Sequence, residues 1–319
     1  AGEGNVIPYN WGGTSYGYVV GGYNVYHGID RFSLASGTNN AVIGTVTTIA
    51  FGHATYGYHA QGGSSSDTHI YGVGGQGWHG GNHIWQMVSK TAMASSADLV
   101  DHHDLDLANG EMRSCNNRTH AYHPGGDGYP TGGAHNPPGF GAITAIQKTT
   151  YATDVSSTNV GVLAVATAGG GSVSDSGADY GYRNGVYTST TVGTLQKFSF
   201  TNDVNASNIG TLTYNKGNRT QSNGSDTHGY ATGGNGSDVI ESFLFSNEAT
   251  QTDVGNLMSG LDYGCACSST TYGYVMAGNG PGNAQRIQRF SFASQTENSS
   301  QTSLSGQSWG QVQLSNGQE

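Results

Sequence analysis

Hydrophobic and polar positions recur along this chain in short units that repeat together. One unit has an aromatic residue, then apolar residues, and ends at glycine, as in Tyr274–Gly278. The next alternates apolar and polar residues, as in Ile287–Phe292, so that Phe290 and Phe292 lie on one face of a strand. A third unit resembles Asn208–Thr213, and a fourth, small and polar, precedes the next Gly-Tyr, as in Gly264–Ser269. Each unit has the length of a short strand.

Six copies of the aromatic unit occur. Their tyrosines are Tyr18, Tyr71, Tyr129, Tyr182, Tyr230 and Tyr274. A repeat of roughly 50 residues with four strands is typical of a propeller blade. We therefore predict an all-β chain that forms one domain over residues 1–319, a six-bladed β-propeller with four antiparallel strands in each blade.

The repeat also predicts the blade boundaries and how the ring closes. The blades are expected to start near residues 16, 69, 127, 180, 228 and 272. The segment 6–13 matches the fourth unit without the first three, so residues 1–13 are expected to supply an N-terminal strand that closes the last blade. Such closure removes open sheet edges. Residues 308–319 are then expected to be a tail.

Composition excludes several classes of partner. The chain has 53 glycines and only 10% charged residues, which suits short strands and turns. The net charge is -10 and the 11 Lys and Arg residues are scattered, so nucleic acid is not an expected partner. No apolar run reaches the length of a membrane span, and no signal peptide is evident. Cys115, Cys265 and Cys267 are expected to be free thiols, made in a reducing compartment.

The motifs resemble two known kinds of repeat. The strand order and the Gly-Gly after an aromatic residue resemble kelch-type repeats, without their usual Trp. The phrases "SNGSDTHGYATGGNGSDVI", "RFSFAS" and "SSTTYGYVMAG" resemble repeats in tail-fibre-like structural proteins of tailed bacteriophages, especially those of marine cyanobacteria. The resemblance runs from Tyr16 to about Gly306. It implies a virion protein that is assembled in the host cytoplasm and exposed on the particle surface.

One polar run interrupts the repeat and has metal-ligand chemistry. The run "DHHDLD" places Asp101, His102, His103 and Asp104 together, followed by Asp106. Imidazole and carboxylate groups bind divalent metals, and carboxylates alone suit calcium. The spacing matches no established loop, so the alternatives are a divalent-metal site and a solvated polar insertion. No other cofactor is expected.

Aromatic and histidine residues outside the repeat are the candidate ligand contacts, because the regular repeats need their aromatic residues in the core. They are Trp78, His79, His83, His120, His123 and His135, from the second and third repeats. Aromatic rings beside polar side chains can hold sugar faces. Packing between blades is the alternative. His69 and His228 recur at equivalent repeat positions, so we expect a structural role for them.

No catalytic constellation stands out in the sequence. There is no Gly-x-Ser-x-Gly elbow, no phosphate-binding glycine loop, and no evident carboxylate pair of the glycosidase kind. We therefore expect a non-enzymatic virion protein whose partners are other virion proteins and a host surface glycan or receptor. An architectural decoration subunit and a propeller enzyme acting on polysaccharide are the other hypotheses.

Overall fold

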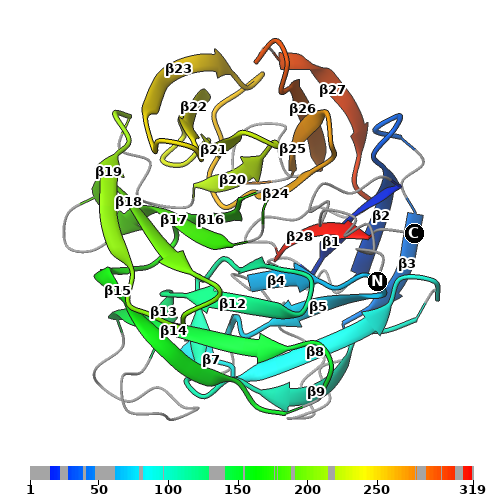
Figure 1. Cartoon of the computed structure of the whole chain (residues 1–319). Coiled ribbons are helices and arrows are strands. Elements are labelled where there is room, and N and C mark those ends of the chain that lie inside the picture. The colour runs from blue at the N-terminus through cyan, green and yellow to red at the C-terminus, as the bar shows by residue number, and fades with distance from the viewer. Residues whose placement is uncertain are drawn as a thin grey trace, which may run out of the picture.

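The computed structural model describes residues 15–21, 28–38, 41–46, 62–78, 82–95, 97–128, 141–153, 155–175, 177, 179–187, 191–214, 220–276, 278, 285–295, 297–305 and 312–317. Every regular element within these ranges is a β-strand. The strands form six small antiparallel sheets in a ring around a central axis (Figure 1). The predicted six-bladed β-propeller is therefore confirmed.

Five blades are four-stranded sheets, whose strands follow one another from the axis outward. The first contains β28 (Val312–Gly317), β1 (Tyr16–Val20), β2 (Gly28–Ser33) and β3 (Ala41–Thr45). The second contains β4 (Gly62–Ser65), β5 (His69–Val73), β8 (Met87–Ala92) and β9 (Val100–Asp104). The fourth contains β16 (Gly171–Ser174), β17 (Tyr180–Tyr187), β18 (Thr191–Ser199) and β19 (Ser207–Thr211). The fifth contains β20 (Gln221–Gly224), β21 (His228–Thr232), β22 (Val239–Leu244) and β23 (Thr250–Asn256). The sixth contains β24 (Cys265–Ser268), β25 (Tyr272–Met276), β26 (Arg286–Ser291) and β27 (Glu297–Ser303).

The third blade carries additional short strands. Its four blade strands are β11 (Cys115–Asn116), β12 (His120–Pro124), β14 (Gly141–Thr150) and β15 (Thr158–Thr167). β10 (Asn109–Gly110) and β13 (Asp127–Gly128) extend this sheet at one end. In the second blade, the chain between β5 and β8 forms a separate antiparallel pair, β6 (Gln76–Trp78) and β7 (Asn82–Ile84). The departures from the regular repeat are thus concentrated in the second and third blades.

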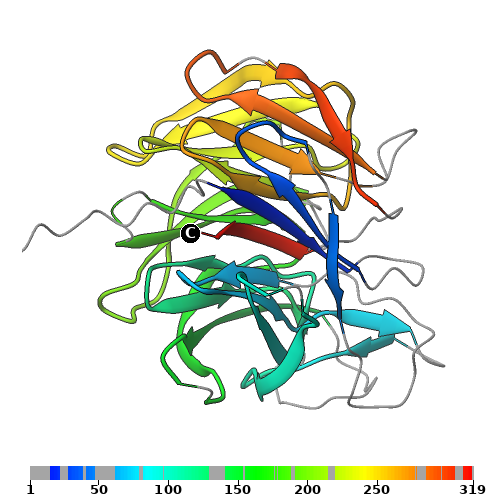
Figure 2. The same cartoon turned by 90° about the vertical axis from the view of Figure 1, so that its right-hand side faces the viewer.

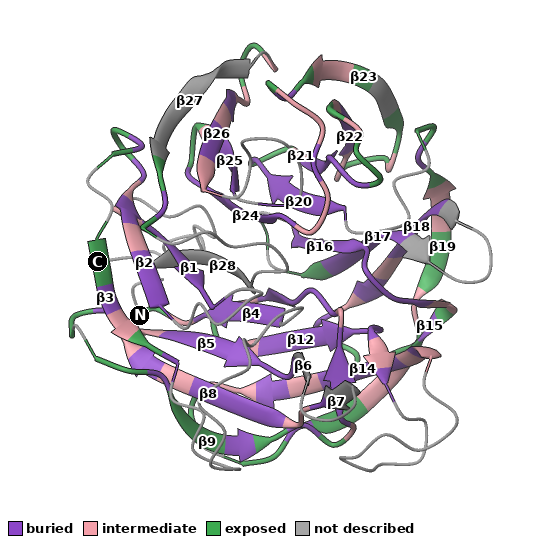
Figure 3. Ribbon diagram, turned by 180° about the vertical axis from the view of Figure 1, so that it is seen from behind, coloured by how far each residue is buried: buried purple, intermediate pink, exposed green. Residues whose placement is uncertain are grey.

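The small polar unit forms the innermost strand of each blade. The strands β4, β11, β16, β20, β24 and β28 contact one another around the axis. All four residues of Cys265–Ser268 are buried, and Figure 3 shows the central strands β4, β16, β20 and β24 as buried. Each such strand pairs with the tyrosine-containing strand of its blade, and in the second to sixth blades it precedes that strand in the sequence. Small side chains are required here because six strands converge on one axis.

Ring closure differs from the sequence-based expectation. The C-terminal strand β28 pairs with β1 and completes the first blade, with Val312 opposite Val20 and Leu314 opposite Tyr18 (Figure 2). Residues 312–317 are therefore not a tail. The segment 6–13 lies outside the described residues, and the sixth blade already has four strands of its own. The small polar unit forms the innermost strand of a blade and not the outermost one. The blade that is completed by a terminal strand is therefore the first and not the last.

The tyrosine-containing strand of the third blade lies earlier in the sequence than the repeat pattern predicts. The equivalent of the other core tyrosines is Tyr122, which is buried in β12 and pairs with Lys148. Tyr129 lies outside the described residues. The segment Thr119–Gly126 follows the same pattern as Thr227–Gly234, but His123 and Pro124 stand where the fifth repeat has Ala231 and Thr232. Those polar and cyclic residues concealed the strand, which begins at His120 rather than near residue 127.

The blades are joined by aromatic contacts between neighbours. Tyr122 stacks on Phe200 of the next blade with ring centroids 4.3 Å apart, and Tyr230 stacks on Phe292 at 5.1 Å. Tyr274 packs on Phe32 of the first blade at 5.5 Å, so the same contact also joins the last blade to the first. These distances are those of favourable aromatic pairs. The aromatic residues of the regular repeats therefore lie in the core, as predicted, and fill the space between blades.

In four blades a glycine precedes the core tyrosine, at Gly17, Gly181, Gly229 and Gly273, and packing requires it there. A Cβ atom at Gly229 would lie 2.2 Å from the ring of Phe243, and one at Gly17 would lie 2.4 Å from the ring of Phe32. No real Cβ approaches a neighbouring atom so closely. The Gly-Tyr pair therefore provides both the ring between the blades and the space for the phenylalanine beside it.

A second contact recurs between neighbouring blades, and we call it the inter-blade latch. A polar side chain on the third strand of one blade binds the backbone that follows or forms the fourth strand of the preceding blade. Gln196 accepts from Val165 N–H at 2.9 Å and donates to Val165 C=O at 3.2 Å. The corresponding residues in other blades are Gln147 on Leu107, Gln288 on Met258, Asp30 on Ser305 and Glu241 on Thr213.

Glu241 is the exception within this set. Its Oε1 accepts from Thr213 N–H at 2.7 Å and from Tyr214 N–H at 3.2 Å. Its Oε2 is buried and has no hydrogen-bond partner among the described residues. A buried acceptor without a donor destabilises the folded state by about 1–3 kcal/mol. The latch of the fifth blade is therefore incomplete.

We predict that Glu241→Gln stabilises the protein by about 1 kcal/mol, because the amide can donate where the carboxylate oxygen cannot. The free energy of unfolding at pH 7 measures the effect. The reciprocal change Gln196→Glu is the matched control and should destabilise. A Glu241→Gln variant no more stable than the parent chain would refute the assigned role of this oxygen.

We also predict that ending the chain before Val312 lowers the free energy of unfolding by roughly 3 kcal/mol or more. The truncation removes the strand that pairs with β1 and leaves that edge open beside buried Tyr18 and Val19. Denaturant unfolding measures the change, and a chain lacking only Gln318 and Glu319 is the control. Equal stability of the two chains would contradict the closure by β28.

Candidate functional site

The connections that depart most from the regular repeat start and end on one face of the ring. All six blades run in the same sense, so the connections between their second and third strands emerge on the same side. In the second blade this connection contains β6 and β7, and in the third it contains β13 and residues 129–140, which lie outside the described residues. The fifth blade joins the same strands with residues 233–238 alone. We call the face that carries these two connections the insertion face.

Asn109 ties the two insertions together. Its carbonyl accepts from Gly75 N–H at 2.8 Å, and its N–H donates to the carbonyl of Trp85 at 3.1 Å. Its side-chain amide donates to the carbonyl of Gly125. Ile84 and Ala108 pack together beneath. The bases of both connections are therefore fixed to each other and to the ring.

Two carboxyl groups meet next to this anchor. Asp127 lies opposite Gly110 in the β10–β13 pair, so Glu111 is close to it. Burial, and secondly the negative charge of Glu111, raise the pKa of Asp127 to about 7. Both side chains are half-buried. The insertion face thus carries a carboxyl group that holds its proton near neutral pH.

A hollow of about 310 Å³ lies on the strand that pairs with Asp127. Its walls are formed by Leu107, residues 141–145, Asn159 and Val162. It lies where β15 bulges away from β14, since Ile143 pairs with Thr167 but Ala145 pairs with Val162. Ala142 in its wall is the register partner of Asp127. The volume is at the lower end of the range for small-molecule sites.

The predicted ligand contacts fall in different places. Trp78 and His83 lie on the β6–β7 pair of the insertion face, with Trp78 opposite Asn82 and Gly77 opposite His83. His79 and His135 lie outside the described residues. For these four residues the ligand-binding role stays a prediction.

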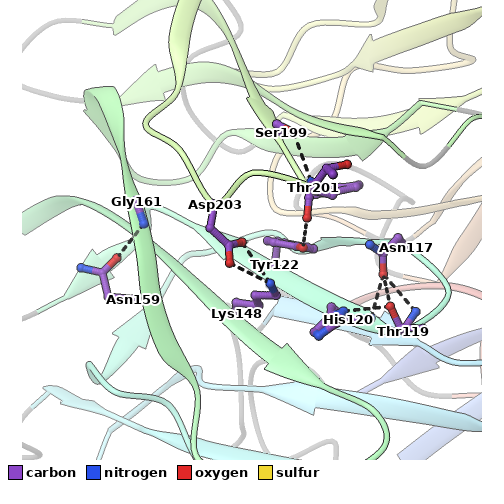
Figure 4. Close-up of polar contacts among 11 residues, drawn as sticks. Asn117, Thr119, His120, Tyr122, Lys148, Asn159, Gly161, Ser199, Thr201 and Asp203 are labelled. Atoms are coloured by element: carbon purple, nitrogen blue, oxygen red, sulfur yellow. Dashed lines mark hydrogen bonds and ion pairs between the residues drawn. The ribbon is translucent and has the colours of Figure 1, made fainter.

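His120 lies on the opposite face of the ring, at the start of β12. Its Nδ1 is 2.8 Å from the hydroxyl of Thr119, and Figure 4 shows this contact beside Asn117. His69 and His228 make the same contact with Thr68 and Thr227, both at 2.8 Å. His120 is therefore the third member of a repeated turn, which extends to it the structural role expected for His69 and His228.

The surroundings of His120 belong to the blade boundary. Lys148 forms an ion pair with Asp203 of the next blade at 3.0 Å and lies over the ring of Tyr122 (Figure 4). Burial, and then the charge of Lys148, lower the pKa of His120. The cluster joins the third blade to the fourth at their outer edge.

His123 is fully buried and faces no solvent. Its Nδ1 is 2.8 Å from the hydroxyl of Ser114, and its Nε2 is 3.1 Å from the hydroxyl of Thr149. Burial lowers its pKa to about 3, with a smaller contribution from His103. A ligand on the surface cannot reach this ring, so His123 and His120 do not form one site with the insertion-face residues.

The polar run of the second repeat forms the outer strand β9. Asp101, His102 and Asp104 are exposed, whereas His103 is buried and turned toward the third blade. In the part of the chain that the structure describes, no three His, Cys, Asp or Glu side chains gather as a metal site. The geometry of these four residues gives no support to the metal hypothesis.

Sequence reasoning did not identify Asn109, Glu111 and Asp127. With Tyr129 taken as the third core tyrosine, the segment before it looked irregular. With Tyr122 in that role, Asp127 falls directly after the Gly-Gly pair that ends the strand. A charged residue at that position was the available signal.

Comparison of the chain with known protein families and with curated proteins found no match. Among the described residues, no helix has the length and apolar character needed to cross a membrane.

We predict that Asp127 makes stability depend on pH. Its folded-state pKa of about 7 lies above its ordinary value of 3.8, so the folded protein binds a proton that the unfolded chain releases. Stability is therefore fully present below the lower value and is lost as the pH rises through the higher one. Unfolding of Asp127→Asn across pH 4 to 8 should show less of this loss than the parent chain. Identical pH profiles would show that Asp127 titrates normally in the folded state.

Proposed function

We propose that this chain is a non-catalytic binding module of a bacteriophage particle, carried on a tail fibre or surface appendage, and that it engages a host glycan or another virion protein through the insertion face. The observation that carries this is the anchored pair of insertions on neighbouring blades. Binding residues commonly lie on loops that a rigid scaffold positions. The resemblance of the repeats to tail-fibre-like proteins supports the particle assignment.

The core aromatic residues of the regular repeats are buried and therefore do not contact a partner. Tyr182, Tyr230 and Tyr274 are fully buried between blades, as are Phe243 and Phe290. Trp78 and His83 belong to β6 and β7, a hairpin that the regular blades lack. A module with a constant ring and one modified face is suited to binding rather than to internal support.

A polysaccharide-acting enzyme is the second candidate, and the carboxyl pair of Glu111 and Asp127 favours it. A protonated carboxyl beside a second carboxyl group is the requirement for acid catalysis of glycoside cleavage. Release of reducing ends from host polysaccharide by the parent chain, abolished in Asp127→Asn, would establish this candidate. Absence of such release from the parent chain would leave the binding module.

The binding proposal is tested by removing the hairpin. Gln76 lies opposite Ile84 in the β6–β7 pair, so residues 77–83 can be replaced by a short Asn-Gly turn that keeps the buried side chain of Ile84. We expect particles with this change to lose at least about tenfold in adsorption to the host, while the melting temperature of the purified chain changes by no more than about 2 °C.

The matched control lies on the opposite face. Asp67 and Arg118 form an exposed ion pair at 3.4 Å between the loops of the second and third blades. Particles with Asp67→Ala and Arg118→Ala should adsorb normally. Normal adsorption by the hairpin variant would remove the attachment role and leave the alternative of an architectural decoration subunit.

A further inference from the structure

Two arginine side chains are buried beside the propeller axis. Arg113 is 3% exposed and reaches across the axis from the third blade to the carbonyl of Gly264 in the sixth. Arg183 is 0% exposed and points from β17 toward the third blade. The hydroxyl of Ser172 donates to the carbonyl of Arg113 at 3.0 Å and accepts from Arg183 at 3.4 Å. The two arginines are therefore neighbours.

Among the described residues, the hydrogen-bond partners of Arg183 are all neutral. Its Nε donates to the hydroxyl of Thr167 at 3.0 Å, and its Nη1 donates to the carbonyl of Gly170 and to Ser172. Its Nη2 is buried and has no hydrogen-bond partner in the described part of the chain. A buried charge without an opposite charge or a full set of hydrogen bonds strongly disfavours the folded state.

The charges around Arg183 do not balance. Arg113 is the charged group that acts on it most strongly and has the same sign, and Glu111 is the carboxylate that acts on both arginines. The thiols of Cys115 and Cys265 also lie close, but burial raises their pKa values far above neutral pH, so they carry no charge. Burial and Arg113 lower the pKa of Arg183 to about 9, which still leaves it charged at pH 7. Within the described residues, one carboxylate faces two guanidinium groups.

We propose that a small inorganic anion of the chloride class binds at Nη2 of Arg183, between the third and fourth blades. The site takes a small ion because Thr167, Gly170 and Ser172 around the guanidinium are all buried. Ser172, which accepts from Arg183, also lines an axial hollow of about 30 Å³, which has room for a particle of the size of a water molecule. The anion completes the hydrogen bonding of Arg183 and offsets its repulsion from Arg113. This inference does not depend on the proposed attachment function.

Anion-dependent stability is the first test. Ligand that binds only the folded state raises its stability with the logarithm of ligand concentration above the dissociation constant. Thermal unfolding of the full chain is measured in sodium chloride, sodium bromide and sodium gluconate at equal ionic strength, so that screening is constant. We expect the midpoint to rise with chloride or bromide and to stay constant with gluconate, which is too large for the site. Arg183→Gln should remove the halide dependence, whereas Lys197→Gln, which removes an ion pair with Glu248 of the fifth blade, should retain it.

A direct measurement covers the case in which Arg183→Gln fails to fold. Crystals of the parent chain grown with sodium bromide are examined by anomalous diffraction at the bromine edge. An anomalous peak at hydrogen-bond distance from Nη2 of Arg183 supports the site. An ordered water there without anomalous signal, or equal midpoints in chloride and gluconate, overturns the proposal.

Discussion

The packing of a tyrosine from one blade against a phenylalanine of the next holds the ring together. The contact repeats at the boundaries of the third to sixth blades and joins the sixth blade to the first through Tyr274 and Phe32. The phenylalanine ring lies over a glycine on the neighbouring strand of its own blade, as Phe243 does over Gly229 and Phe32 over Gly17, where a side chain would clash with it. A sequence with few long apolar runs can therefore still bury a continuous set of rings. At the boundary between the second and third blades a tyrosine takes the place of the phenylalanine, since Tyr71 stacks on Tyr151 with ring centroids 4.8 Å apart.

Hydrogen bonds from polar side chains join neighbouring blades in addition to the aromatic contacts. The inter-blade latches connect the third strand of one blade to the backbone of its predecessor, and they do so with Gln, Asp or Glu according to the blade. At the axis, small residues let the inner strands meet, and Arg113 spans the centre. Buried polar groups are stabilising only when they are satisfied. Glu241 and Arg183 are two of the residues whose buried polar atoms have no hydrogen-bond partner in the described part of the chain.

The repeat in the sequence was sufficient to predict the six blades and the role of the aromatic residues. The prediction failed where individual residues departed from the repeat pattern. His123 and Pro124 concealed the second strand of the third blade, because a buried imidazole held by Ser114 and Thr149 replaces an apolar residue there. Closure was assigned to the wrong end because the polar unit was taken as the last strand rather than the first. The sequence named His120 and His123 as candidate ligand contacts, but His120 lies on the opposite face and His123 is buried in the core. Glu111 and Asp127 come together only through the pairing of β10 with β13, which no sequence pattern indicated.

The structure separates a constant ring from one modified face, and we assign recognition to that face. Electron cryomicroscopy of the intact particle tests this most directly, because the orientation of the propeller can be determined from the β6–β7 hairpin and the β28–β1 pair. We expect the propeller to sit at the tip of an appendage with the insertion face turned away from the particle. An insertion face packed against neighbouring subunits in a regular lattice would contradict this assignment.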